Sequence, residues 1–421
     1  MTRSKSGAPA SCARRALQPP GGRKGRPIQC AGRTPRACDL HTRRSARLHA
    51  RLDLAHVGFG LRPLPERGGQ APSSVMRGKM IAVRMLILGG TRFVGYAVLS
   101  AALRRGWDVT SFSRGLSGTP PPGTRIVHGD RTNRADLEQV AAAGPWDAVV
   151  DTSGFVPRDV LLACEYLRPV TTHYLFVSTV SVYRGWPKEP LSESSEVLFC
   201  PPDAGPDYGE NIEDGPTQYG YQKSGCELAV TSSFGPEHCT ILRPGVILGP
   251  REYVGRLPWW LHRVGRGAHV LAPGDPSRFI QPIDVRDVAD FALMAISRQL
   301  AGAYNITAPR QRETFGQLLQ ACAEVTGAHV KFIWVSDAEL IAAGVRQWSD
   351  LPLWRTFPGV WQVDSTAARS AGLSNRRIIE TVADTWAWIN SSTADFTDQR
   401  SAEIGISPAL ERQILSQHSD R

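Results

Sequence analysis

Long apolar runs are missing from this chain of 421 residues. No stretch of about 18 consecutive apolar residues occurs, so we expect no membrane-spanning helix. The shorter apolar run that a secretory signal requires is also missing. The eight cysteines contain no Cys-x-x-Cys pair, which leaves zinc and thioredoxin-type chemistry without support. Scattered cysteines of this kind suit a reducing cytoplasm, which is the location we expect.

Acidic residues are scarce at the start of the chain. Residues 1–79 hold 17 Lys and Arg but three acids, and no hydrophobic period persists there. We expect a disordered basic N-terminal extension, or an upstream translation with Met76, Met80 or Met85 as the natural start. An organelle transit peptide or a nucleic-acid-binding tail remains an alternative for an Arg-rich, acid-poor segment.

Basic residues are not in excess in the rest of the chain, residues 80–421. Residues 80–421 hold 32 of the 49 Lys and Arg, against 36 of the 39 Asp and Glu. A nucleic-acid partner requires a basic stripe to neutralise phosphates, so we do not expect one. A small molecule is the expected partner.

Short apolar runs alternate with helical patterns from residue 85 onward. Near-continuous apolar strands between helices predict an α/β fold with a doubly wound parallel sheet of the Rossmann type. We expect this domain over 80–395, with a small C-terminal substrate-binding lobe mainly after residue 250. The polar tail over 396–421 contains a short helix that begins near Ser407 and Pro408. The predicted strands are 85–89, 107–114, 124–130, 146–154, 173–183 and 239–249, and the main helices are 96–106, 134–144, 160–169, 219–234, 313–327 and 379–389.

A glycine-rich loop, LILGGTRFVG, follows the first predicted strand and precedes the first helix. Gly89 supplies the sharp turn, and Gly95 lets the helix pack close to the sheet. The backbone amides between them lie at a helix N-terminus, where a pyrophosphate binds. We therefore assign cofactor binding to the whole loop: Gly89, Gly90, Thr91, Arg92, Phe93, Val94 and Gly95.

Two arginines bear on the choice of cofactor. Arg92 replaces the middle glycine of the usual fingerprint and offers a guanidinium beside the pyrophosphate. Arg114 follows the second strand, where an NAD-binding protein generally has an acid. NAD(P) is the expected cofactor, and the arginines favour NADP over NAD. A solvated surface charge is the alternative for either residue alone.

Tyr219 and Lys223 stand four residues apart, a spacing that places both on one face of a helix. A nearby ammonium stabilises a phenolate and lowers its pKa, so the pair can act as acid and base at a carbon bearing oxygen. Tyr221 is two residues from Lys223 and points to the other side. Thr179 lies in a run of hydroxyl residues where a buried strand ends, and ligands of open α/β sheets bind there.

These segments together carry a family resemblance. LILGGTRFVG, VSTVSVY, YGYQK, LRPGVILGP and IDVRDVA follow one another as in the extended short-chain dehydrogenase/reductase superfamily, and resemble most its NAD-dependent epimerase/dehydratase branch. The resemblance covers about residues 84–390. It implies that Tyr219 is the catalytic acid/base, Lys223 its pKa-lowering and cofactor-binding partner, and Thr179 the catalytic hydroxyl. It also implies further cofactor contacts, which are Asp130, Thr152, Ser153, Pro244, Gly245 and Val246.

Departures from the family pattern leave the reaction open. Nucleotide-sugar 4,6-dehydratases have Asp-Glu after the catalytic threonine, whereas Val180 and Ser181 stand here, which argues against dehydration. Epimerisation or simple oxidoreduction of an alcohol or carbonyl group remains. The GGTRFVG form is similar to an atypical subgroup that includes chloroplast stem-loop RNA-binding proteins. A non-catalytic nucleotide- or RNA-binding protein, or a sensor with bound NADP as its signal, is therefore the alternative.

Weaker signals concern the lobe and the loop before Tyr219. Arg278 and Asp284 fall near where family members contact a nucleotide-sugar phosphate, and an ion pair that braces the lobe is the alternative. The loop acids between residues 207 and 214 predict a solvated loop rather than a metal site. Helices beside this sheet often pair in the family, so a homodimer remains open.

Overall fold

The computed structural model describes residues 83–391 and 399–418. The extension predicted over 1–79 and part of the predicted tail lie outside these residues. In the described part, no helix is long and apolar enough to cross a bilayer.

A seven-stranded sheet with parallel pairing throughout is built from strands between Arg84 and Ile306, in the order β11-β6-β5-β4-β1-β2-β3. Its central strands read as unbroken apolar runs because helices cover both faces. The order reverses between β1 and β4, which opens a crevice at their carboxyl ends. The strands are β1 (Arg84–Leu88), β2 (Asp108–Ser113), β3 (Arg125–His128), β4 (Ala148–Asp151), β5 (Tyr174–Val177), β6 (Cys239–Pro244) and β11 (Gly302–Ile306).

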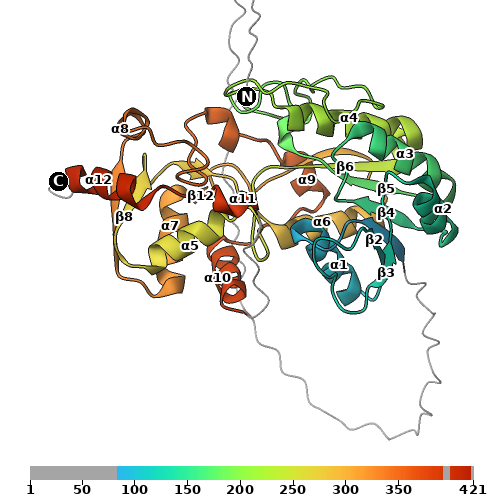
Figure 1. Ribbon diagram of the computed structural model, residues 1–421, viewed down its shortest axis with the longest axis horizontal. Coiled ribbons are helices and arrows are strands. Elements are labelled where there is room, and N and C mark those ends of the chain that lie inside the picture. Colours follow the sequence, from blue (N-terminus) through green and yellow to red (C-terminus); the bar gives the residue numbers. More distant parts are fainter. Residues whose placement is uncertain (1–82, 392–398, 419–421) are drawn as a thin grey trace, which may run out of the picture. The chain divides into compact units, whose positions relative to one another are not determined.

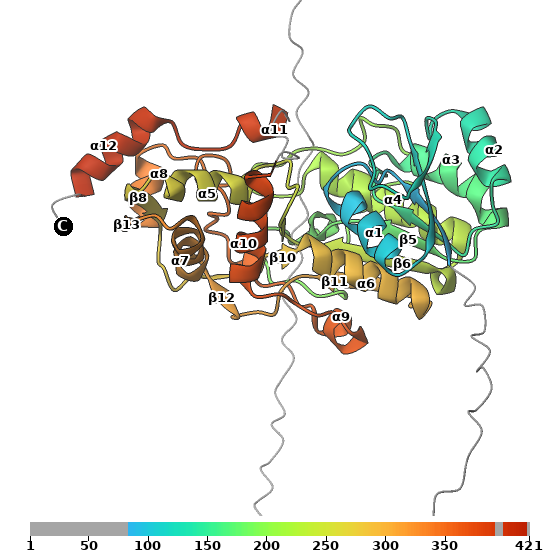
Figure 2. The same ribbon diagram turned by 90° about the horizontal axis from the view of Figure 1, so that it is seen from below.

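Two helical layers enclose this sheet (Figure 1). In that view α3 and α4 lie above the sheet and α1 and α6 below it, and Figure 2 shows α1 and α6 from their own side. The predicted doubly wound Rossmann-type fold is confirmed. The helices are α1 (Phe93–Arg104), α2 (Arg134–Ala142), α3 (Pro157–Leu167), α4 (Gln218–Phe234) and α6 (Val285–Ser297).

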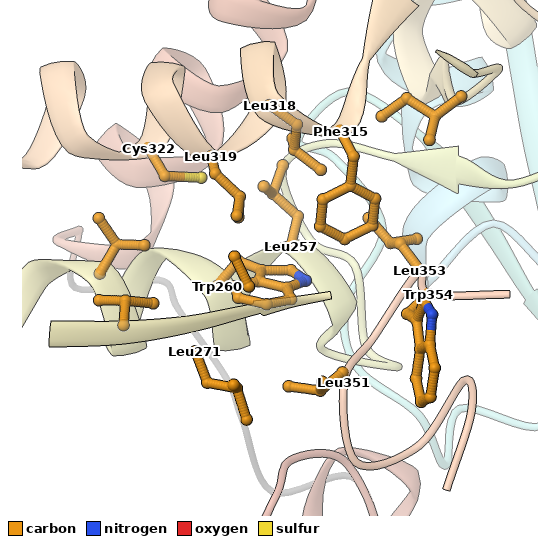
Figure 3. Packing of buried hydrophobic residues seen from close by; sticks show 14 of the residues in the cluster. Leu257, Trp260, Leu271, Phe315, Leu318, Leu319, Cys322, Leu351, Leu353 and Trp354 are labelled. Carbon is orange, nitrogen blue, oxygen red and sulfur yellow. The ribbon is translucent and has the colours of Figure 1, made fainter. Parts of the chain in front are cut away.

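The segments after residue 250 build a lobe with its own core. Trp260 is fully buried at its centre, and its ring meets that of Phe315 edge-on at 5.7 Å (Figure 3). The Trp260 indole N–H also donates to the carbonyl of Pro352 at 2.7 Å, so the polar group of this buried ring is satisfied. The lobe contains α5 (Arg256–Gly265), β8 (Ala268–Pro273), α7 (Phe315–Thr326), β13 (Val330–Val335), α8 (Asp337–Ala342) and α10 (Ile378–Ile389).

Three pairs of short strands complete the described chain, together with two short helices. The strands β8 and β13 pair in parallel within the lobe. The other pairs are β7 (Ile247–Leu248) with β10 (Ile283–Asp284) and β9 (Phe279–Ile280) with β12 (Glu313–Thr314), and the helices are α9 (Thr366–Ala371) and α11 (Gln399–Ala402).

The predicted C-terminal helix is confirmed as α12 (Pro408–His418). The Ser407 hydroxyl accepts from the amide of Leu410 at 3.3 Å, as expected of a capping serine. The helix is more than part of a polar tail, because Glu411 is buried and pairs with Arg263 of α5 at 2.8 Å. It therefore belongs to the lobe.

Two predicted strands are interrupted within their predicted ranges. The strand predicted over 173–183 ends at Val177, because Thr179 caps the single turn η2 (Val180–Val182) with its side chain. The strand predicted over 239–249 divides at Gly245 into β6 and β7. Alternation of apolar and hydroxyl residues does not reveal either break.

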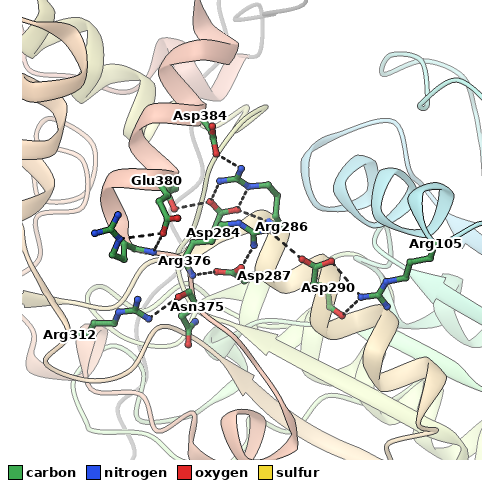
Figure 4. Close-up of polar contacts among 12 residues, drawn as sticks. Arg105, Asp284, Arg286, Asp287, Asp290, Arg312, Asn375, Arg376, Glu380 and Asp384 are labelled. Atoms are coloured by element: carbon green, nitrogen blue, oxygen red, sulfur yellow. Dashed lines mark hydrogen bonds and ion pairs between the residues drawn. The ribbon is translucent and has the colours of Figure 1, made fainter. Parts of the chain in front are cut away.

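A charged network joins α6 to the segment that leads into α10 (Figure 4). Asp284 caps α6 through the amide of Arg286 and also pairs with the Arg286 guanidinium at 2.7 Å. Arg286 continues to Asp384, and Asp287 pairs with Arg376. Asp284 therefore forms a bracing ion pair, which was the alternative interpretation, and its role near a substrate phosphate stays a prediction.

His173 provides a pH test of the sheet. Its Nε2 lies 2.7 Å from the Thr240 hydroxyl, and burial lowers its pKa from 6.5 to about 4. The unfolded chain therefore binds a proton that the folded chain does not, between pH 6.5 and about 4. We expect the free energy of unfolding to decrease as the pH is lowered from 6.5 to about 4, by up to about 1.4 kcal/mol per pH unit.

Urea unfolding of wild type and His173→Gln at several pH values measures this effect. The glutamine keeps a hydrogen-bonding side chain and removes the titration, so its stability should change less across the same window. Equal pH dependence in both proteins would contradict the assignment.

Candidate active site

The glycine loop between β1 and α1 has the close packing that a phosphate cradle requires. Gly89 and Gly90 adopt φ values of +106° and +98°, which side chains rarely tolerate. A Cβ on Gly95 would lie 2.8 Å from the Gly90 Cα, so the helix start contacts the loop directly. Within the described chain, no side chain caps the first turn of α1, and that turn carries no acid. The loop therefore fits a bound pyrophosphate.

Arg92, the residue that replaces a glycine of the fingerprint, has an aromatic neighbour. Its guanidinium lies 5.7 Å from the ring centroid of Tyr253, in the loop before α5. Phe93 meets the same ring edge-on at 6.3 Å. Arg92 thus contributes a cation–π contact with a residue far away in the sequence. Sequence reasoning missed Tyr253, which only the fold brings to the loop.

The carboxyl end of β4 completes the floor of the cradle. Thr152 Oγ1 donates to the Leu88 carbonyl at 3.1 Å and lies 2.7 Å from where a Cβ on Gly89 would be. Ser153 is next to the same glycine. On the other side, the Thr91 and Ser117 hydroxyls are 2.9 Å apart. The structure thus brings Thr91, Thr152 and Ser153 together with the glycines.

A buried ion pair below this floor was not predicted. Arg131 donates to both carboxylate oxygens of Asp151, at 3.0 and 2.8 Å, and its Nη1 reaches Ser153 Oγ at 3.4 Å. The Tyr174 hydroxyl adds a third bond to Asp151 at 3.0 Å. Burial opposes ionisation of Asp151, but Arg131 outweighs it and holds the pKa of that carboxyl below its usual value. In the sequence, the position of Arg131 next to Asp130 is the only indication of this ion pair.

Asp130 and Arg114 lie where the adenosine end of a dinucleotide is expected. Asp130 accepts from the amide and hydroxyl of Thr132 at 2.9 and 2.8 Å, and these bonds lower its pKa, with a smaller effect from Arg114. Arg114 is exposed just after β2. The two residues are therefore within electrostatic reach of one another.

Lys223 is held away from solvent on α4. Its Nζ donates to the carbonyls of Gly154 and Val177 at 2.9 and 2.6 Å. The same nitrogen lies 4.3 Å from the centroid of the Phe176 ring and 5.2 Å from that of Phe155. Burial lowers the pKa of Lys223. Sequence spacing alone does not reveal these contacts with the ends of β4 and β5.

Tyr219 lies one turn before Lys223 on α4, with its ring 6.5 Å from that of Phe155. Desolvation of the hydroxyl raises its pKa to about 12, with the Tyr253 hydroxyl adding to the rise and a hydrogen bond from Thr179 opposing it. The residue as a whole is 45% exposed. Lys223 is not among the groups that shift the Tyr219 pKa in this structure, where its ammonium donates to two carbonyls, and its role in lowering that pKa stays a prediction.

A second buried network supports the end of β5. Arg243 of β6 pairs with Glu227 of α4 at 2.6 Å, and both side chains are buried. Ser178 donates to Glu227 at 2.5 Å, while Arg243 also donates to the Tyr183 hydroxyl at 3.0 Å. Tyr183 in turn donates to Asn305 at 2.8 Å. Glu227 was missed, although it stands one helical turn after Lys223.

The segment from Pro244 to Val246 lies at the carboxyl end of β6, as predicted for a cofactor contact. The Gly245 amide donates to the Ile306 carbonyl at 3.1 Å, and the Val246 carbonyl accepts from Ile283 at 2.9 Å. These backbone groups therefore hold neighbouring strands. A contact with a nicotinamide amide stays a prediction for this segment.

A cavity of about 380 Å³ opens in the lobe. Three arginines line it, Arg278, Arg310 and Arg355, together with the aromatic rings of Phe279, Phe357 and Trp361. Two buried donors at this cavity, Arg278 Nη1 and Trp361 Nε1, have no hydrogen-bond partner among the residues that the structure describes. Buried donors without partners are costly, so their presence here indicates a ligand site.

Arg278 forms an ion pair at the cavity, and its contact with a substrate phosphate stays a prediction. It lines the cavity, and its Nη2 pairs with Asp337 of α8, which also accepts from the Trp354 indole at 2.8 Å. In the described residues, no group of three or more His, Cys, Asp or Glu side chains is arranged to hold a metal ion.

The sheet order and the glycine loop at its switch point define a Rossmann-type α/β protein. A model of the NAD dependent epimerase/dehydratase family matches residues 85–307, more than half of the chain. The chain therefore belongs to that family, as the sequence resemblance implied.

One curated relative is the chloroplast stem-loop binding protein of 41 kDa b from Arabidopsis thaliana. It is 27% identical over 260 residues, which are 58% of this chain and 63% of that protein. The present chain thus matches less than two thirds of that relative's length.

Solved structures of other proteins share the fold. The Bordetella bronchiseptica enzyme WbmG, in complex with NAD and UDP, aligns with a TM-score of 0.56 at 16% identity, over 73% of this chain and 95% of that one. The UDP-glucose 4-epimerase of Thermus thermophilus, in complex with NAD, has a TM-score of 0.52 at 18% identity, over 74% of this chain and all of the other.

Proposed function

We propose that this protein is an NAD(P)-dependent epimerase or oxidoreductase that acts on a sugar nucleotide or a related anionic small molecule. The observation that carries the proposal is the cavity lined by Arg278, Arg310 and Arg355, with two buried donors that lack partners in the described part of the chain. Guanidinium groups recognise phosphates through paired hydrogen bonds. Aromatic rings in the same cavity suit the planar base of a nucleotide.

The glycine loop and the ends of β2 and β4 would hold the cofactor. The pyrophosphate would lie on the amides at the start of α1, and Thr152 and Ser153 would line the floor. When bound, the dinucleotide supplies hydride transfer at an alcohol or carbonyl carbon.

The chain's own residues would hold and move the proton. Thr179 and Tyr219, which share a hydrogen bond, would bind the substrate oxygen. The raised pKa keeps Tyr219 protonated at neutral pH, so it would donate to a carbonyl oxygen. Lys223 would place a positive charge below the site from its fixed position between two carbonyls. Dehydration is disfavoured because Val180 and Ser181 follow Thr179 where the dehydratases have acids.

A non-catalytic RNA-binding role is the second candidate function. The similarity to the Arabidopsis stem-loop binding protein favours it. The excess of acids in residues 80–421 opposes it, since RNA binding requires positive charge.

The cavity can be tested by ligand binding. We expect Arg278→Met to weaken UDP binding about tenfold or more, because a charge-assisted phosphate contact is lost. Isothermal titration of wild type and variant with UDP measures this. Arg412→Met, an exposed arginine on α12, is the matched control and should bind as wild type does. Equal UDP affinity in Arg278→Met and wild type would count against the substrate site.

The role of Tyr219 as proton donor can be tested by removing its hydroxyl. With NAD present, Tyr219→Phe should lower turnover of any UDP-sugar substrate by about 100-fold or more, because the proton donor is gone. Its affinity for the dinucleotide, measured by nicotinamide fluorescence, should stay near that of wild type. Tyr221→Phe is the control on the same helix. A fully active Tyr219→Phe protein would refute the mechanism.

The preference for NADP rests on Arg114. We expect wild type to bind NADPH more tightly than NADH, and Arg114→Asp to reverse this order, because an acid repels the 2′-phosphate. Fluorescence titration of both proteins with both dinucleotides gives the ratio. Tighter NADH binding by wild type would instead indicate an NAD enzyme, and an unchanged ratio in the variant would exclude Arg114 from the pocket.

A further inference from the structure

Arg355 in the lobe cavity is paired with a carboxylate from the loop that precedes the catalytic helix. Its Nη1 lies 3.4 Å from Asp214 Oδ1. The guanidinium is also positioned over the rings of Trp348 and Phe357, at 5.5 and 5.6 Å. These contacts fix its position at the cavity wall.

The three arginines of the cavity differ in their partners. Arg278 is neutralised by Asp337. Arg310 donates to the backbone carbonyls of Leu191 and Gln362 at 3.3 and 3.0 Å, and the described residues show no carboxylate in an ion pair with it. Asp214 is therefore the carboxylate that offsets a second positive charge. If Asp214 withdrew, two guanidinium charges would face a doubly charged pyrophosphate group.

The ion pair between Asp214 and Arg355 is weak and exposed, so a ligand can displace Asp214 from it. The contact is a single one at 3.4 Å, and the Asp214 side chain is 47% exposed. An exposed ion pair of this kind contributes little, so a ligand phosphate can replace it.

The loop that carries Asp214 is tied to the start of α4. The Gly215 amide donates to the Ile212 carbonyl at 3.1 Å, and the Ile212 amide donates to Pro216 at 2.9 Å. Asn211 accepts from the amide of Gln218, the first residue of α4, at 3.1 Å. Tyr219 is the next residue. Asp214 therefore lies in a short, hydrogen-bonded turn that leads directly into the helix start with Tyr219.

We propose that Asp214 is a specificity-determining residue that competes with the ligand's phosphates for Arg355. The inference rests on the proposed function, since it requires an anionic ligand in the cavity. A ligand with a pyrophosphate would displace the carboxylate, whereas a neutral nucleoside would leave it in place. Asp214 thus makes binding in the cavity depend on the charge of the ligand.

The test compares binding of UDP and uridine by wild type, Asp214→Asn and Arg355→Met, using isothermal titration. Asp214→Asn should bind UDP about two- to fivefold more tightly, which corresponds to the loss of an exposed ion pair. Uridine should bind equally to both, because it carries no phosphate. Arg355→Met should bind UDP more weakly than wild type. Asp207→Asn, an exposed acid of the same loop, is the matched control.

A gain in UDP affinity confined to Asp214→Asn supports the proposal, and misfolding cannot produce such a gain. Unchanged or weaker UDP binding by Asp214→Asn, with wild type still binding UDP, overturns the competition but leaves the proposed function intact. A gain for uridine equal to that for UDP also overturns it, because the effect would not depend on charge. If wild type binds neither UDP nor inorganic pyrophosphate, both the proposed function and this inference fail.

Discussion

The buried pair of Glu227 and Arg243 is the interaction on which the active-site end of the sheet depends. Two charges are removed from water there, a cost that only close geometry and further hydrogen bonds offset. Ser178 and Tyr183 supply those bonds. The pair thus fixes the end of β5 relative to α4 and β6. Thr179 follows Ser178, and Tyr219 lies on α4. The Glu227–Arg243 pair therefore sets the position of the Thr179 hydroxyl relative to the Tyr219 hydroxyl.

Much of the fold could be predicted because its determinants are local. The spacing of apolar residues indicated the strands of the parallel sheet and the helices between them, and Ser407 marked the start of the last helix. The breaks after Val177 and at Gly245 were missed, because they arise from a side-chain cap and from pairing with strands later in the chain. Such partners are not visible in a window of neighbouring residues.

The candidate site was predictable only in its residue types. The glycine loop and the Tyr–Lys spacing came from short motifs, but the surroundings that set their chemistry are long-range. Lys223 donates to Gly154 and Val177, so the raised pKa of Tyr219 could not be inferred from helical spacing. Arg92 was expected at a phosphate, and the structure adds Tyr253 as its neighbour. Tyr253 lies in the loop before α5, so nothing in the sequence around residue 92 predicts this contact.

The position of α12 in the lobe has a consequence for how the chain is assembled on the ribosome. The last strand of the large sheet, β11, is synthesised long before α12, and domains generally fold in the order in which they emerge. The sheet can form while the lobe still lacks Glu411, the partner of Arg263. All seven strands of the sheet are therefore available for pairing before the C-terminal partner of Arg263 has been made.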